Sequence, residues 1–257
     1  MDQTTFGQLP AIRIASNDGA EAIVTLYGAH LVSWKGADGV ERMFCSARSA
    51  LDGGKAIRGG VPVIFPQFAE RGAGMRHGFA RVSTWRLEDS GDGWAVFGLH
   101  ESDLPEQLAA GWPHRFALAL RVAVRGNELA MTLTVRNTGD APFPFAAALH
   151  TYHLVPELRE VRIEGVAAQT LAIEDKLDQV YRQIAGAITM ATGERTVTLE
   201  QEGFTDAVVW NPGAVDAAAL SDMEDGEYRR FVCIEPALLD PLTLAPGSAW
   251  EGSYHIR

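Results

Sequence analysis

Cysteine is nearly absent from this chain: only Cys45 and Cys233 occur among 257 residues. The two lie far apart in unrelated local sequence, which excludes a framework of disulfides as the basis of the fold. Such sparse cysteine usage is typical of proteins in reducing compartments. The sequence therefore predicts a cytoplasmic protein with free thiols.

Basic residues are also scarce. The chain has 22 Lys and Arg against 33 Asp and Glu, which gives a formal net charge of −11. A nucleic-acid surface needs clustered cations that displace counterions from phosphates, so we expect no nucleic-acid partner. A small phosphorylated ligand is not excluded, because a local group of arginines outweighs acidic residues beyond a Debye length of about 8–10 Å.

Long apolar runs are missing as well. No run approaches the roughly 18–20 residues of a membrane-spanning helix. Residues 1–14 lack the basic region, apolar stretch and cleavage site of a signal peptide. We therefore expect a soluble intracellular protein with no membrane partner.

Signatures of cofactor binding are absent from the sequence. It contains no Gly-rich phosphate loop opening a helix and no G-x-S-x-G motif. His150 and His153 would point to opposite faces of a strand, so they could not share one metal ion, and the other histidines lack ligand spacing. The sequence predicts no cofactor and no metal, and leaves acid–base chemistry by His and carboxylates.

Alternation of apolar residues with a period of two is abundant. Residues 116–124 and 129–135 alternate on either side of the turn 125–127, which predicts a β-hairpin with one buried face. Shorter runs of the same kind occur at 12–15, 22–27, 30–34, 94–99, 161–163, 196–199, 207–210, 231–234 and 253–256. Helical patterns are confined to 104–110 and 217–223. The sequence thus predicts an all-β sandwich or barrel, and without repeats or linkers we expect one domain over residues 1–257.

Two arginine-bearing segments could carry function. In IRGGVP, residues 57–62, two glycines would let a backbone approach closely beside Arg58, although a solvated surface arginine is the plain alternative. In RHGFAR, residues 76–81, an extended conformation would place His77, Phe79 and Arg81 on one face. Arg76 would lie at the strand's entry. A row of imidazole, aromatic ring and guanidinium suits a sugar phosphate, and an exposed polar strand face is the alternative.

Candidate acids and bases lie further along the chain. His150 follows a nearly apolar stretch, so we expect it at the end of a buried strand, where a histidine is more often structural than catalytic. Glu235 ends another apolar run before Pro236, and desolvation there would raise its pKa and its basicity. Asp206 precedes the run 207–210. A structural carboxylate capping a strand end is the alternative for Glu235.

These segments occur in a recognisable order, and together they resemble one family. The motifs are Arg58-Gly59-Gly60-Val61-Pro62, Phe65-Pro66-Gln67-Phe68, His77-Gly78-Phe79-Ala80-Arg81, His150-Thr151-Tyr152, Val209-Trp210-Asn211-Pro212 and Cys233-Ile234-Glu235-Pro236. The chain resembles the hexose-6-phosphate mutarotase (glucose-6-phosphate 1-epimerase) branch of the aldose 1-epimerase superfamily over nearly its whole length. The resemblance implies a large antiparallel β-sandwich of the galactose-mutarotase-like type with sugar bound in an open cleft.

The resemblance also implies roles for individual residues. His150 would be the general acid and Glu235 the general base for ring opening. Arg58 and Arg81 would hold the substrate phosphate, Asp206 would bind sugar hydroxyls, and His77 would be the second histidine of the site. Arg76 departs from the family pattern, which often has Gln at this position, so the preferred sugar stays open.

Three functions remain at this stage. The first is interconversion of the α and β anomers of a hexose 6-phosphate without a cofactor. The second is an aldose 1-epimerase for free sugars, for which arginines are not required. The third is a carbohydrate-binding module without turnover. The sequence does not give the oligomeric state, although a monomer is favoured.

Overall fold

A computed structural model describes residues 2–257, in which antiparallel strands far outnumber helices, as expected. The strands are β1 (Asp2–Phe6), β2 (Leu9–Ala15), β3 (Glu21–Thr25), β4 (His30–Lys35), β5 (Val63–Ile64), β6 (Arg86–Gly91), β7 (Trp94–His100), β8 (Phe116–Arg125), β9 (Glu128–Asn137), β10 (Phe143–Leu149), β11 (Tyr152–Leu154), β12 (Arg162–Glu164), β13 (Leu171–Ala172), β14 (Leu177–Tyr181), β15 (Ile188–Ala191), β16 (Thr196–Glu202), β17 (Asp206–Asn211), β18 (Phe231–Leu244) and β19 (Ala249–Ile256). The helices are α1 (Glu106–Gly111), α2 (Gly213–Ala218) and the 3₁₀ turns η1 (Ala80–Val82), η2 (Glu101–Asp103), η3 (Leu158–Glu160) and η4 (Glu227–Arg230).

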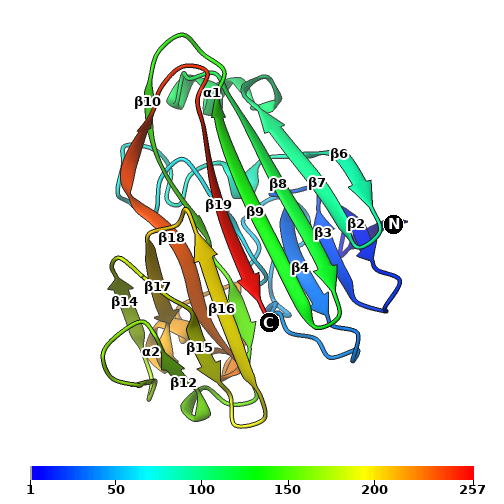
Figure 1. The fold of residues 1–257 in the computed structure, drawn as a ribbon, viewed down its shortest axis with the longest axis vertical. Coiled ribbons are helices and arrows are strands. Elements are labelled where there is room, and N and C mark those ends of the chain that lie inside the picture. The colour runs from blue at the N-terminus through cyan, green and yellow to red at the C-terminus, as the bar shows by residue number, and fades with distance from the viewer. Residues whose placement is uncertain (1) are drawn as a thin grey trace.

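The strands form three antiparallel sheets. A nine-stranded sheet runs in the order β13-β12-β15-β16-β19-β9-β8-β7-β6, and a four-stranded sheet comprises β1 to β4. The third sheet runs β14-β17-β18-β10-β5, with β11 also paired to β18. In Figure 1, β19, β9, β8 and β7 lie side by side, and β2 to β4 pass behind them, where β2 and β3 pack against β8.

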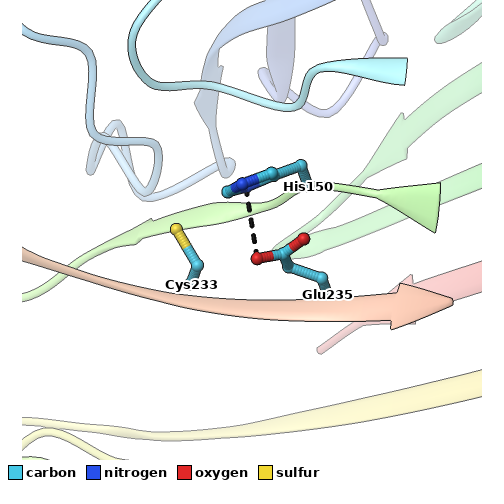
Figure 2. A group of neighbouring side chains, drawn as sticks. All are labelled: His150, Cys233 and Glu235. Carbon is cyan, nitrogen blue, oxygen red and sulfur yellow. Dashed lines mark ion pairs between the residues drawn. The ribbon is translucent and has the colours of Figure 1, made fainter. Parts of the chain in front are cut away.

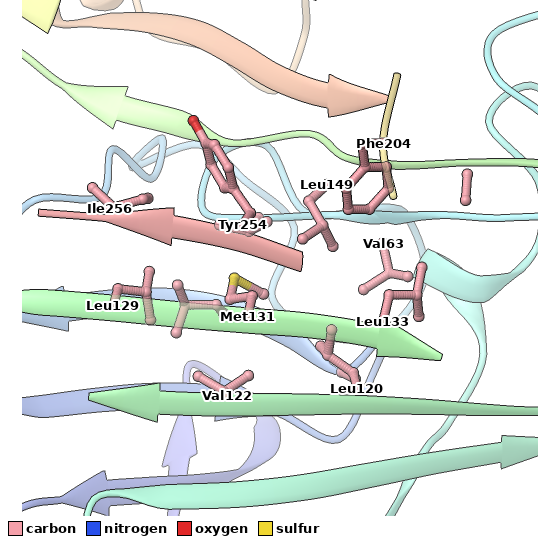
Figure 3. Packing of buried hydrophobic residues seen from close by; sticks show 14 of the residues in the cluster. Val63, Leu120, Val122, Leu129, Met131, Leu133, Leu149, Phe204, Tyr254 and Ile256 are labelled. Atoms are coloured by element: carbon pink, nitrogen blue, oxygen red, sulfur yellow. The ribbon is translucent and has the colours of Figure 1, made fainter. Parts of the chain in front are cut away.

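The predicted hairpin is confirmed as β8 and β9, joined by a tight turn after Arg125. Its register pairs Leu120 with Leu133 and Val122 with Met131, and these apolar side chains all point to one face. In Figure 3 they pack against Leu149 and other residues from outside the hairpin. The period-two pattern therefore marks the layer where the sheets meet, and its burial supplies the main stabilisation of the fold.

The helical predictions are partly correct. Helix α1 lies within the predicted segment 104–110 apart from its last residue, while α2 begins four residues before the predicted 217–223 and ends at Ala218. Within residues 2–257, none of the helices has the length and apolar character needed to cross a membrane.

Candidate active site

One face of the sheet formed by β14, β17, β18, β10 and β11 is the floor of the candidate site. Directly opposed residues of neighbouring strands form two rows across it. One row is Val180, Val208 and Glu235, and the other is Asp178, Trp210, Cys233 and Tyr152. Since alternate residues of a strand share a face, these side chains all project from the same side of the sheet.

His150 extends the first row. The register of β18 against β10 shifts at a bulge between Phe145 and Ala147. Beyond the bulge, Ala148 opposes Ala237, and the same register continues against β11, where Tyr152 opposes Cys233. His150 lies in the break between β10 and β11, so this register places it opposite Glu235. Cross-strand neighbours on one face stand close enough to interact, which brings the two residues together from positions 85 apart in the sequence.

Above this floor lies a cleft of about 560 Å³. Six of the seven residues predicted for the site line it, namely Arg58, Arg76, His77, Arg81, His150 and Glu235. Asp206 does not line it. The rest of the lining comes largely from the segments that contain residues 55–58 and 68–81.

His150 and Glu235 face each other at the bottom of the cleft (Figure 2). The imidazole Nδ1 lies 3.4 Å from Glu235 Oε1, and both residues are buried, Glu235 being only 1% exposed. Neither His150 Nδ1 nor Glu235 Oε2 has a hydrogen-bond partner within the described chain. Buried polar atoms without partners are costly, so their presence in a cleft indicates groups prepared for a ligand.

Burial drives the two groups toward their neutral forms. Desolvation raises the pKa of Glu235 well above its usual value, and the charge of Asp178 adds to this. Desolvation also lowers the pKa of His150 well below its usual value, with further contributions from His77, Arg81 and Arg58. A protonated carboxyl beside a neutral imidazole holds the same number of protons as a carboxylate beside an imidazolium, so one proton moving between them interconverts the two states.

The prediction that Glu235 ends its strand is wrong. Strand β18 continues to Leu244, and Pro236 remains paired with Ala207 of β17. Proline lacks the N–H that a strand interior needs for pairing. Pro236 is tolerated because, on the side of β18 away from β17, it faces the break between β10 and β11, where the hydrogen-bond ladder is interrupted. The predicted burial of Glu235 is nevertheless confirmed.

Arg58 lines the same cleft beside Tyr152. Its Nη1 donates to the Tyr152 hydroxyl at 3.1 Å, and its Nη2 lies 3.1 Å from Asp222 Oδ2. The two glycines that follow Arg58 allow a close approach of the chain, as predicted. Gly60 has φ +58°, and a Cβ there would lie 2.1 Å from the Leu31 carbonyl oxygen.

The predicted extended conformation of residues 76–81 is wrong. His77 and Gly78 have positive φ, and Ala80 begins the 3₁₀ turn η1. A Cβ at Gly78 would lie 2.0 Å from the Phe65 carbonyl oxygen, so glycine is required where the chain folds back. Phe79 consequently packs into the hydrophobic core and is no platform for a sugar ring.

The turn still delivers Arg81 and Arg76 to the cleft. Arg81 Nη2 donates to the Arg76 carbonyl oxygen at 3.0 Å, while Arg81 Nε is buried and has no hydrogen-bond partner within residues 2–257. Arg76 is mostly exposed and lies 3.3 Å from Glu70. Arg81 therefore lines the same cleft as Arg58 and keeps one buried guanidinium N–H without a partner in the described chain.

His77 is held as a neutral donor. Its Nδ1 accepts a hydrogen bond from the backbone N–H of Ala69 at 3.2 Å, which leaves the proton on Nε2. Desolvation, followed by the charges of Arg81, Arg76 and Arg58, lowers the pKa of His77 to about 3. Its ring centroid lies 5.5 Å from that of His150.

Asp206 lies on the cleft face of β17 but beyond the cleft itself. Arg182 Nη1 donates to Asp206 Oδ2 at 3.0 Å, and the Gln183 N–H donates to Oδ1 at 3.2 Å. These contacts tie its carboxylate to the segment that follows β14. The structure therefore does not bring Asp206 together with the other predicted residues.

The residues of the cleft lining that the prediction missed include Tyr152, Asp178, Trp210 and Asp222, together with the cations Lys55 and Arg71. Asp178 supplies a carboxylate beside Trp210 on the floor, where the sequence indicated Asp206. Tyr152 and Trp210 belong to the motifs named in the sequence. Both could have been predicted by listing the motif residues that share a strand face with the candidate acid and base. Nothing in the sequence near Asp178 or Asp222 marks either one.

One group of side chains has the composition of a metal site. Ligand atoms of His150, Cys233 and Glu235 all lie within 4.8 Å of one another. Metal binding requires a deprotonated thiol, whereas burial raises the pKa of Cys233 well above its usual value. The surroundings therefore favour neutral acid–base groups over a metal-ligating thiolate.

Comparison with known proteins shows similarity over nearly the whole chain. Residues 10–257 match the protein family described as "Aldose 1-epimerase". A protein of Cenchrus ciliaris, provisionally named glucose-6-phosphate 1-epimerase, is 35% identical over 270 aligned positions, covering 94% of this chain and 82% of its own.

Solved structures show the same fold. A Salmonella typhimurium protein, provisionally described as a mutarotase, superposes with a TM-score of 0.88 at 26% identity, covering 99% of this chain and 92% of its own. A galactose mutarotase-like protein from Clostridium acetobutylicum gives a TM-score of 0.76 at 16% identity, covering 100% and 97%. The predicted large antiparallel sandwich of the galactose-mutarotase-like type is confirmed.

Proposed function

Because the chain belongs to the aldose 1-epimerase family and is an isomerase of that type, we propose that its substrates are hexose 6-phosphates. The observation that carries this proposal is the pair of cleft arginines, Arg58 and Arg81, in the same cavity as the His150–Glu235 pair. A neutral sugar does not require two guanidinium groups, whereas phosphate oxygens accept from them in a bidentate manner.

Local charge supports this proposal despite the overall charge of −11. Arg81 Nε is a buried donor with no partner in the described chain, and a phosphate oxygen would satisfy it. Arg76, whose side chain is 64% exposed and pairs with Glu70, adds a further positive charge, as do Lys55 and Arg71 in the cleft lining. The anionic end of a hexose 6-phosphate would thus lie toward the arginines, with its ring over the floor of the cleft.

The reaction follows from the His150–Glu235 pair. The Glu235 carboxylate removes the proton from the anomeric hydroxyl O1, and the His150 imidazolium donates a proton to the ring oxygen O5. The C1–O5 bond breaks and gives the aldehyde, a neutral Glu235 and a neutral His150. Rotation about C1–C2 and the reverse proton transfers then close the ring as the other anomer.

Burial assists the intermediate in this scheme. The open-chain stage pairs a protonated Glu235 with a neutral His150, which is the state that desolvation favours. Ring opening therefore relieves a charge separation in a low-dielectric site. Because burial also favours the neutral pair before ring opening, the imidazolium–carboxylate state must be formed first, and its cost offsets this gain.

The remaining polar groups of the cleft would orient the sugar. His77 Nε2–H donates, and the Asp178 carboxylate accepts, so the two suit hydroxyl groups at different positions of the ring. Trp210 contributes an indole edge beside the His150 ring, with centroids 5.9 Å apart. Asp206, tied to Arg182, has no direct role in this arrangement.

Magnetisation-exchange NMR on anomeric protons tests the proposal. Purified protein should accelerate α/β exchange of glucose 6-phosphate far more than that of glucose or galactose at equal concentrations. Equal acceleration of the free sugars would reassign the protein as a general aldose 1-epimerase. Sugar binding without any acceleration would instead indicate a carbohydrate-binding protein.

A further inference from the structure

The arginines of the cleft are connected to the acid–base pair through one aromatic side chain. The Tyr152 ring stacks on the His150 imidazole, with centroids 4.9 Å apart and an interplanar angle of 10°. The hydroxyl of the same Tyr152 accepts the hydrogen bond from Arg58 Nη1. A single rigid, buried residue therefore spans the distance from the phosphate end of the cleft to the general acid.

The positive charges at that end oppose protonation of His150. Burial keeps the imidazole neutral, and the charges of Arg81 and Arg58 act in the same direction. The opposing groups are Glu235 of β18 and Asp222, which pairs with Arg58, and the other titratable groups on the floor are Asp178, Cys233 and Tyr152. Since the ring-opening step needs the imidazolium, the arginines by themselves suppress it.

An anion bound to the arginines reverses this effect. Two negative charges placed on Arg58 and Arg81 cancel their field at His150 and favour the imidazolium–carboxylate state of the pair. The phosphate of a substrate would then do more than anchor the sugar. Its binding energy would be used to establish the charge state that the reaction requires.

We propose that any small oxydianion on Arg58 and Arg81 activates the His150–Glu235 pair, so that the protein epimerises unphosphorylated hexoses when a free oxydianion is present. This inference rests on the proposed function, because it assumes that these arginines bind the phosphate of the substrate. The step needs no covalent link between sugar and anion. The cleft of about 560 Å³ has room for two small molecules together.

Phosphite dianion is the probe, and D-glucose is the sugar. Exchange of the anomers of glucose is measured by NMR with and without phosphite, at constant ionic strength set by chloride. Because oxydianions also catalyse this exchange in water, the rate in the same buffer without protein is subtracted. A shift of one pKa unit changes the protonated fraction of His150 about tenfold, so we expect phosphite to raise the enzymatic rate on the order of tenfold.

Two variants sharpen the test. Arg81→Ala should abolish the activation by phosphite, because the unpaired guanidinium is lost. Arg86→Ala is the matched control, since Arg86 pairs with Asp103 on the exposed surface outside the cleft and its loss changes the net charge equally. This control should respond to phosphite like the wild type.

The outcomes distinguish failure of the activation by oxydianions from failure of the proposed function on hexose 6-phosphates. Glucose exchange that stays at the chloride rate in phosphite overturns the inference, whether or not phosphite competes with glucose 6-phosphate. Activation that persists in Arg81→Ala also overturns it. If glucose 6-phosphate itself is not accelerated by the folded protein, the proposed function fails instead.

Discussion

The rings of His150 and Tyr152 lie parallel, with centroids 4.9 Å apart, while the Tyr152 hydroxyl is hydrogen-bonded to Arg58. Tyr152 therefore has two separable functions in the cleft. Its ring packs against His150, the proposed general acid, and its hydroxyl accepts a hydrogen bond from the Arg58 guanidinium. The sequence places both residues on one strand face, because they are two positions apart.

Removal of the Tyr152 hydroxyl tests this separation. Tyr152→Phe keeps the ring against His150 but frees Arg58 Nη1, so we expect the KM for glucose 6-phosphate to rise about tenfold, the equivalent of 1.4 kcal/mol. The kcat should change little. Steady-state measurement of both parameters checks this, and a large loss of kcat with an unchanged KM would contradict it.

The pH dependence of kcat/KM reports the proton shared by His150 and Glu235. In the proposed mechanism, activity requires one proton on the pair. A second proton is taken up only below the lowered pKa of His150, and the single proton is lost only above the raised pKa of Glu235. We therefore expect a broad, bell-shaped pH profile of kcat/KM. Its acid limb should lie well below pH 6.5 and its alkaline limb well above pH 4.5. Rates for glucose 6-phosphate across pH 4–10 measure it, corrected for ionisation of the phosphate; an acid limb above pH 6.5 would contradict it.

Burial of Glu235 should cost stability as the pH rises. Its folded pKa is raised, so the folded state retains a proton that the unfolded chain releases above about pH 4.5. Wild-type stability is therefore lost with increasing pH, by up to about 1.4 kcal/mol per pH unit. Glu235→Gln cannot ionise, so its Tm relative to wild type should increase between pH 5 and 8. A difference in Tm that is constant with pH would refute this explanation.

Asp178 and Asp206 form a matched pair for testing which carboxylate contacts the sugar. Asp178→Asn should raise the KM for both phosphorylated and free sugars, because Asp178 lines the cleft. Asp206→Asn should leave KM unchanged and lower the stability by about 1 kcal/mol, since it weakens the contacts to Arg182 and Gln183. KM values together with thermal unfolding distinguish the two, and a KM effect confined to Asp206→Asn would reverse the assignment.

The sequence predicted strands correctly where apolar and polar residues alternate strongly. It failed where a turn or a break in a neighbouring strand determines the backbone conformation. The hairpin of β8 and β9 follows directly from its apolar period because one face must be buried. The segment around His77 looks extended by composition, yet Gly78 permits a left-handed conformation and a contact with Phe65 that no local pattern encodes. The continuation of β18 past Pro236 depends on a break in a neighbouring strand, which is likewise a tertiary feature.

The site was predictable as a set of motifs but not as a complete cavity. His150 and Glu235 were identified on their own segments, and their register across β18 brings them together. Asp178 and Asp222 lie in polar segments without a motif, and only the pairing of β14 with β17 and the contact with Arg58 bring them into the cleft.

Anomer exchange in three proteins with two sugars tests the central claim most directly, namely that one cleft joins a proton-transfer pair to a phosphate site. The proteins are wild type, Glu235→Gln and Arg81→Ala, and the sugars are glucose 6-phosphate and glucose. We predict that Glu235→Gln lowers kcat/KM for both sugars on the order of 10²–10⁴-fold. Arg81→Ala should lower it strongly for the phosphate ester and hardly at all for glucose. Equal losses for both sugars in Arg81→Ala, or near-normal exchange in Glu235→Gln, would contradict the account.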